Sequence, residues 1–186
     1  MARVRLNETR DLPEEHRRIF ERMEERQGGV LNIFRALSHC PEPMRRFMRL
    51  GSWLLEEGRL SPALRELAIL RAGWECRSRY EFSQHVSFAR RAGLTEAQIR
   101  GVGDPTIQLF DPQQMAVLAF AGELSRDAAV SDATWSAAAS FFDEAEMVEL
   151  AMVTAYYNMV SRMLNALEVE LDARAAADFE AVGAPF

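Results

Sequence analysis

A run of residues between 64 and 74 that is apolar on almost every side of a helix constrains the fold of this chain more than any other feature. Ser61 and Pro62 precede it. This pair is typical of a helix start, because the serine oxygen accepts a free backbone N–H and proline presets φ. The apolar side chains of the run are Leu64, Leu67, Ala68, Ile69, Leu70 and Ala72. A helix without a polar face has to be surrounded by other elements, so the sequence predicts a buried helix around which the domain is built.

Glu66 lies inside this apolar run. A carboxylate on a buried helix needs a partner or a raised pKa, which makes Glu66 a candidate acid or base. The alternative interpretation is structural, with Glu66 paired to Arg65, Arg71 or another arginine.

A second predicted helix follows the turn at 75–77 and carries Ser78, Glu81 and His85 at steps of three and four. This spacing places Glu81 and His85 on one helix face. A histidine can exchange a proton near neutral pH, although one with apolar neighbours is also a common core residue. Glu81 can instead complete a capping box with Ser78 that only starts the helix. Ser78 is expected to be a cap rather than a nucleophile, because no base or oxyanion hole is indicated for it.

The three candidate acid–base side chains are expected to converge within a few ångströms beside a substrate pocket. Trp74, Ser78 and Tyr80 are predicted to line this pocket together with residues of later helices. Burial lowers the pKa of a histidine and a neighbouring carboxylate raises it. At close range we expect the carboxylate to dominate and to keep His85 partly protonated near neutral pH.

Three stretches of the sequence carry a family resemblance: LSPALRELAILRAG, YEFSQH and ARRAGLTEAQI. A weaker echo occurs in YYNMVSRMLNALEVE, and the stretches together cover roughly residues 30 to 170. At these stretches the chain resembles the carboxymuconolactone decarboxylase family, which includes the alkylhydroperoxidase D-like proteins. The resemblance implies an alkylhydroperoxidase D-like helical bundle and an assembly of two, three or six identical subunits.

The peroxidase branch of that family carries a glutamate, a Cys-x-x-Cys pair and a histidine, in that order. Counting back from His85, the two cysteine positions fall on Ser78 and Glu81, and the glutamate position falls on Glu66. Neither cysteine is present in this chain, so it resembles a branch that lacks the pair. The resemblance implies that Glu66, Glu81 and His85 are the catalytic residues.

The first functional hypothesis is a cofactor-independent lyase acting on a small carboxylated lactone or a similar cyclic acid. Loss of carbon dioxide leaves a carbanion that has to be stabilised and then protonated, and histidine and carboxyl groups suit that task. A thiol peroxidase acting through Cys76 between molecules is the second hypothesis, and a catalytically silent oligomeric binding protein is the third. No metal is expected, because His39 and Cys40 are adjacent and no second ligand pair follows at zinc-like spacing.

The composition of the chain limits the cellular compartments and the classes of partner that we expect. The 186 residues carry a net charge of −6, which argues against a nucleic-acid-binding surface. The first residues lack the apolar run of a signal peptide, and no stretch has the ~18 uninterrupted apolar residues of a membrane helix. With only two cysteines, a disulfide framework is not expected and a cytoplasmic location is the default. Apolar residues on more than one face of the predicted helices also favour a homo-oligomer.

No alternation of β-branched residues indicates a strand, so the sequence predicts an all-α domain of eight or nine helices. Residues 1–29 are expected to form an N-terminal arm and helix, and residues 30–172 the helical domain. Residues 173–186 are expected to form a weakly amphipathic C-terminal tail. Gly101, Gly103 and Pro105 mark the stretch 101–110 as a loop.

Overall fold

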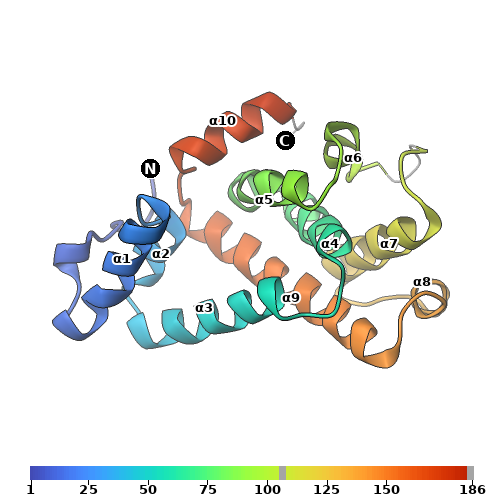
Figure 1. The fold of residues 1–186 in the computed structure, drawn as a ribbon, viewed down its shortest axis with the longest axis horizontal. Helices are drawn as coiled ribbons and strands as arrows, with labels where there is room; N and C mark the ends of the chain where they lie inside the picture. The colour runs from blue at the N-terminus through green and yellow to red at the C-terminus, as the bar shows by residue number, and fades with distance from the viewer. Residues whose placement is uncertain (105–107, 184–186) are drawn as a thin grey trace.

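The computed structural model describes residues 1–104 and 108–183 (Figure 1). These residues contain ten α-helices, one 3-10 helix at Thr9–Asp11 and no strand, which confirms the predicted all-α class. The α-helices are α1 (Glu14–Gln27), α2 (Asn32–Leu37), α3 (Pro41–Glu56), α4 (Pro62–Glu75), α5 (Arg79–Arg91), α6 (Glu96–Gly101), α7 (Pro112–Asp127), α8 (Asp132–Ala139), α9 (Glu144–Leu167) and α10 (Ala173–Val182). Helices α2 and α6 are the shortest, with six residues each.

Helix α4 is the centre of the fold. Every residue from Leu64 to Gly73 is buried, and the helix packs against α5, α7 and α9 (Figure 1). The prediction of a buried helix without a polar face is therefore confirmed. Burial of apolar surface on all sides of one helix is the main stabilising contribution to such a core.

Side-chain caps begin most of the helices around this core. The Oγ atom of Ser61 accepts the N–H of Leu64 at 3.4 Å, as predicted for the start of α4. Reciprocal capping boxes begin α6, α7 and α9 at Thr95, Asp111 and Asp143. Each cap satisfies N–H groups that have no partner within the helix.

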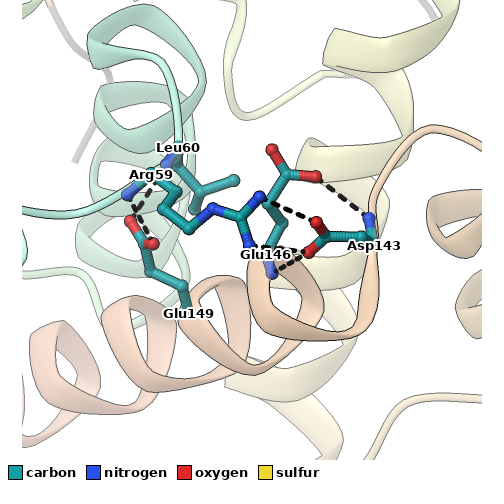
Figure 2. A network of polar contacts seen from close by, with 5 residues as sticks. All are labelled: Arg59, Leu60, Asp143, Glu146 and Glu149. Atoms are coloured by element: carbon teal, nitrogen blue, oxygen red, sulfur yellow. Dashed lines mark hydrogen bonds and ion pairs between the residues drawn. The ribbon is translucent and has the colours of Figure 1, made fainter.

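A buried carboxylate on α9 fixes the backbone that leads into α4. Glu149 accepts the N–H of Arg59 at 2.7 Å and the N–H of Leu60 at 3.1 Å (Figure 2). The guanidinium of Arg59 pairs with Asp143 at 2.8 Å, and the backbone N–H of Asp143 donates to Glu146 at 3.0 Å (Figure 2). The segment that leads into α4 is therefore tied to the N-terminal part of α9 by charged hydrogen bonds.

The C-terminal end contains a helix that the sequence does not predict, and the predicted N-terminal helix packs on α3. Residues 173–186, predicted to be a tail, contain α10, which packs on α5 and buries Phe179 and Val182. At the other end, Phe20 and Met23 of α1 form a second apolar cluster with Met44 of α3. Packing against α5 stabilises α10, and this contact between distant segments is not visible in the local sequence.

Among residues 1–104 and 108–183, no helix has both the length and the apolar character needed to cross a membrane.

Candidate active site

A buried histidine lies between two carboxylates where α4 and α5 cross. The Nδ1 atom of His85 is 2.8 Å from Oε2 of Glu66 on α4, and Nε2 is 3.2 Å from Oε1 of Glu81 on α5. Glu66 is 2% exposed, and Glu81 and His85 are each 5% exposed. The structure thus brings together the three side chains predicted to be catalytic, and both ring nitrogens of His85 face a carboxylate.

The turn between α4 and α5 allows this approach. A Cβ atom at Gly73 would lie 3.3 Å from the backbone nitrogen of Phe82, so the two helices pack closely where a side chain would push them apart. Arg77 adopts the left-handed conformation with φ of 50°, which reverses the chain between the helices. Tight packing at the turn sets the distance over which Glu66 reaches His85.

Ser78 and Glu81 have different roles at the start of α5: the first caps the helix and the second contacts His85. Ser78 is fully buried, and its Oγ atom accepts the N–H of Glu81 at 3.4 Å, which makes it the cap of the helix. The side chain of Glu81 turns to His85. In the described part of the chain, Ser78 is a simple serine cap, and the side chain of Glu81 does not close a capping box with it.

Aromatic rings enclose the histidine. The ring of Tyr157 on α9 meets His85 edge-on, with centroids 4.8 Å apart, and Phe88 stacks on it at 5.2 Å. Burial, together with the negative charges of Glu81 and Glu66, raises the pKa of Tyr157 well above 10, so its hydroxyl stays protonated. These rings keep water away from the charged trio and strengthen its interactions.

The protonation of His85 follows from its neighbours. Burial alone lowers the pKa of His85, but the charge of Glu66 and the hydrogen bonds to Glu66 and Glu81 outweigh it and raise the pKa to about 10. The ring is therefore an imidazolium at neutral pH. The carboxylates dominate over burial, as predicted, but the ring is almost fully rather than partly protonated near neutral pH.

A cavity of about 180 Å³ opens beside this trio, between the first turns of α4 and the last turn of α5. Its lining residues are Pro62, Arg65, Glu66, Phe88, Arg91 and Ala92. Glu66 is the member of the trio that lines the cavity, while His85 lies behind Glu66 and Phe88. Of the three, Glu66 is therefore the residue next to a molecule bound in the cavity.

Trp74, Ser78 and Tyr80 are not among the residues that line this cavity. Trp74 packs against Phe82, with ring centroids 6.2 Å apart. The hydroxyl of Tyr80 accepts the N–H of Ile33 and donates to the carboxylate of Asp172. Their role in a substrate pocket stays a prediction.

Both cysteines are free thiols. The Sγ atom of Cys76 lies 3.1 Å from Oδ1 of Asn158, and burial raises the pKa of this thiol. Cys40 is exposed and lies at the start of α3. Within the described part of the chain, no group of three His, Cys, Asp or Glu side chains is arranged to hold a metal ion.

Sequence reasoning did not find four residues of this site. Tyr157 and Phe88 enclose the histidine, and Arg65 and Arg91 line the cavity. Arg65 stands out in the sequence as a charge inside the apolar run of α4, which is the same signal that singles out Glu66. No comparable signal marks Tyr157, because its contact with His85 joins helices far apart in the sequence.

The fold is similar to that of several solved structures. An uncharacterised peroxidase-related protein from Ralstonia eutropha JMP134, described as an alkylhydroperoxidase AhpD core, has a TM-score of 0.83 and 22% identity over 94% of each chain. A peroxidase-related protein from Silicibacter sp. TM1040 has a TM-score of 0.82 and 24% identity over 94% of this chain and 93% of its own. The debrominase Bmp8, in complex with 2,3,4-tribromopyrrole, has a TM-score of 0.82 and 17% identity, covering 98% of this chain and all of its own. At these identities the likeness establishes the fold.

No curated protein matches the chain. The family model described as "Carboxymuconolactone decarboxylase family" matches residues 41–123, a segment that contains Glu66, Glu81, His85 and every residue around the cavity. This segment is similar to the carboxymuconolactone decarboxylase family, and the chain as a whole has an alkylhydroperoxidase D-like fold.

Proposed function

We propose that the protein is a cofactor-independent lyase that decarboxylates a small carboxylated lactone or cyclic acid. The observation that carries this proposal is the buried imidazolium of His85 between Glu66 and Glu81, next to a cavity that Glu66 lines. Such a trio stores a proton in a water-poor place and can release it to a carbanion.

The proposed reaction proceeds in two steps. Cleavage of the C–C bond releases carbon dioxide and leaves the electron pair of that bond on the substrate as an enolate-like carbanion. A proton then passes from Nδ1 of His85 to Glu66 and from Glu66 to the carbanion carbon. Water later returns a proton to His85, so each turnover consumes one proton from solvent.

Glu81 has a positioning role in this scheme. Its carboxylate lies 3.2 Å from Nε2, the nitrogen on the far side of the ring from Glu66. The negative charge stabilises the imidazolium, and the hydrogen bond fixes the ring so that Nδ1 points to Glu66.

The environment of the thiols disfavours the peroxidase alternative. Burial raises the pKa of Cys76, whereas a peroxide-reducing thiol has to be a thiolate. The positions of the family's cysteine pair hold a serine cap and the carboxylate that binds His85. A single thiol cannot close an intramolecular disulfide cycle. The silent binding protein differs from the lyase only in turnover, so a turnover assay decides between them.

A panel of lactone acids and cyclic keto acids labelled with ¹³C at the carboxyl carbon tests the proposal. The wild type should release labelled carbon dioxide and, in D₂O, place one deuterium on the product carbon. His85→Gln should lose about two orders of magnitude of rate. Glu66→Gln should lose at least as much, because Glu66 is the group that meets the cavity.

Arg100→Met, at an exposed position of α6, is the matched control and should keep the wild-type rate. The proposal fails if no compound of the panel releases labelled carbon dioxide. Consumption of an organic hydroperoxide with matching loss of free thiols would instead establish the peroxidase.

A further inference from the structure

A buried arginine lines the cavity, and its Nε atom has no partner in the part of the chain that the structure describes. Arg65 is 8% exposed, and its buried Nε atom has no hydrogen-bond partner among residues 1–104 and 108–183. Its side chain forms no ion pair within the same residues. A buried charge that is neither paired nor hydrogen-bonded is strongly unfavourable, and an arginine presents five N–H donors in a fixed plane. The Nε donor of Arg65 therefore lacks an acceptor among the described residues, and a ligand in the cavity can supply one.

A second arginine lies at the rim of the same cavity. Arg91, at the end of α5, is exposed, and its guanidinium carbon lies 4.4 Å from the centroid of the Phe88 ring. This cation–π contact holds the charge over a ring that itself lines the cavity. Phe88 also stacks on His85, so one aromatic side chain separates the rim charge from the proton site.

The charges around the cavity favour an anion. Arg65, Arg91 and the protonated His85 together outnumber the carboxylates of Glu66 and Glu81. Both of these carboxylates already bind His85. The negative charges are thus committed to the histidine, while the two arginines face the cavity with their charge uncompensated.

The size of the cavity limits the ligand. A volume of about 180 Å³ is small compared with the several hundred cubic ångströms of a site for a drug-sized molecule. An apolar cavity of roughly 150 Å³ can hold benzene. The cavity is open to solvent and has charged as well as apolar lining residues, so its volume is that of a small ring molecule with a charged substituent, and Phe88 offers the apolar surface for such a ring.

We infer that Arg65, with Arg91 at the rim, binds a carboxylate of a small cyclic ligand whose ring packs against Phe88. This inference rests on the proposed function for the identity of the site, and it narrows the substrate to a ring acid held by Arg65. The planar guanidinium can take both oxygens of a carboxylate at once, which a lysine cannot do. The ring then lies between Arg65 and the carboxyl of Glu66.

Calorimetric titration with benzoate, and with benzamide as its neutral isostere, tests the inference. The wild type should bind benzoate at least about tenfold more tightly than benzamide. Arg65→Met should remove this preference, and Arg65→Lys should keep the charge but lose the two-pronged contact, with an intermediate affinity. Arg91→Met should weaken benzoate binding by a smaller factor, because its charge is exposed to solvent. Arg100→Met is the control and should bind both compounds as the wild type does.

Thermal unfolding separates binding from folding. Since Arg65 is buried without a partner, Arg65→Met should melt at or above the wild-type temperature. Equal affinity for benzoate and benzamide, or unchanged benzoate binding by Arg65→Met, would overturn the inference. A further pair of results would also overturn the inference: a wild type that binds no benzoate, and an Arg65→Met variant whose assembly has a smaller mass. Arg65 would then contact a neighbouring subunit instead of a ligand.

Glu66→Gln distinguishes the two proposals. Removal of the Glu66 charge should not weaken benzoate binding, although it should abolish decarboxylation. If benzoate binding depends on Arg65 but no ring acid is turned over, the anion site is supported and the lyase is rejected. Turnover with an unchanged KM in Arg65→Met would reject the anion site and keep the lyase.

Discussion

The Nδ1 atom of His85 lies 2.8 Å from Oε2 of Glu66, in a place where both side chains are almost fully removed from water. A protonated ring in that position stabilises the fold as well as storing a proton. The pKa of His85 is raised from 6.5 to about 10, so the protonated ring is favoured in the folded state relative to the unfolded chain. The stabilisation is fully present below pH 6.5 and is lost as the pH rises through about 10.

The first prediction concerns this pH dependence. Between pH 6.5 and 10 the wild type should lose up to ~1.4 kcal/mol of unfolding free energy per pH unit relative to His85→Gln, which has no proton to release. Urea unfolding at a fixed protein concentration, at several pH values in this range, measures the difference. Parallel curves for the two proteins would show that His85 is neutral in the folded state.

The second prediction is that the cysteines are dispensable. Replacing Cys40 and Cys76 together by alanine should leave the fold intact and any native turnover within about tenfold, because no step of the proposed reaction uses a thiol. Loss of the hydrogen bond between Cys76 and Asn158 should cost little, since a thiol is a weak donor. Titration with peroxide while free thiols are counted gives the complementary measurement. A larger loss of turnover in a folded double variant would restore the thiol mechanism.

The third prediction is a homo-oligomer. Val148, Met152 and Met159 form an exposed apolar stripe along α9, and Leu50 and Trp53 are exposed on α3, which packs beside it. Apolar surface gathered on adjacent helices favours association between copies of the chain. Light scattering should give a mass that is a multiple of 21.1 kDa.

A charge on this stripe tests which surface associates. Met152→Glu should lower the assembly mass, whereas Ala97→Glu, on an exposed site of α6, should not. A single 21.1 kDa particle for the wild type at micromolar concentration would contradict the prediction.

The fourth prediction concerns Glu149, which accepts two backbone N–H groups ahead of α4. In Glu149→Gln the amide nitrogen would face one of these donors, so the variant should lose about 1–3 kcal/mol of unfolding free energy. Glu144→Gln, an exposed change on the same helix, should stay within roughly 0.5 kcal/mol of the wild type. Denaturant unfolding compares them. Equal stability of the two variants would mean that the loop before α4 does not depend on this carboxylate.

The sequence predicts the local part of this structure well. The caps at Ser61, Ser78 and Asp143 and the buried character of α4 follow from short-range rules, and the structure contains all of them. The spacing of Glu81 and His85 predicts that they share one face of α5, whereas Glu66 on α4 is assigned to the site from its place in the apolar run and from the family resemblance.

The part that the sequence did not predict depends on contacts between distant segments. From the sequence alone, residues 173–182 are interpreted as a tail, because the contact of α10 with α5 is not visible there. Tyr157 is likewise interpreted as a core residue, because its contact with His85 depends on how α9 packs. Arg65 has an obvious partner in sequence, its neighbour Glu66, yet Glu66 binds His85 and leaves Arg65 at the cavity. Packing between helices decides whether Glu66 binds Arg65 or His85, and a local sequence pattern does not show that packing.

The first turn of α5 has a consequence for how this fold changes chemistry. Ser78 caps the helix and Glu81 lies one turn later beside His85, at the two positions where the peroxidase branch has cysteines. A thiol at either position would lie at a helix N-terminus, where the positive end of the backbone dipole favours the thiolate. Replacing these two side chains by cysteines would therefore place a thiol pair at the start of α5, with the second thiol one turn before His85, without moving the backbone.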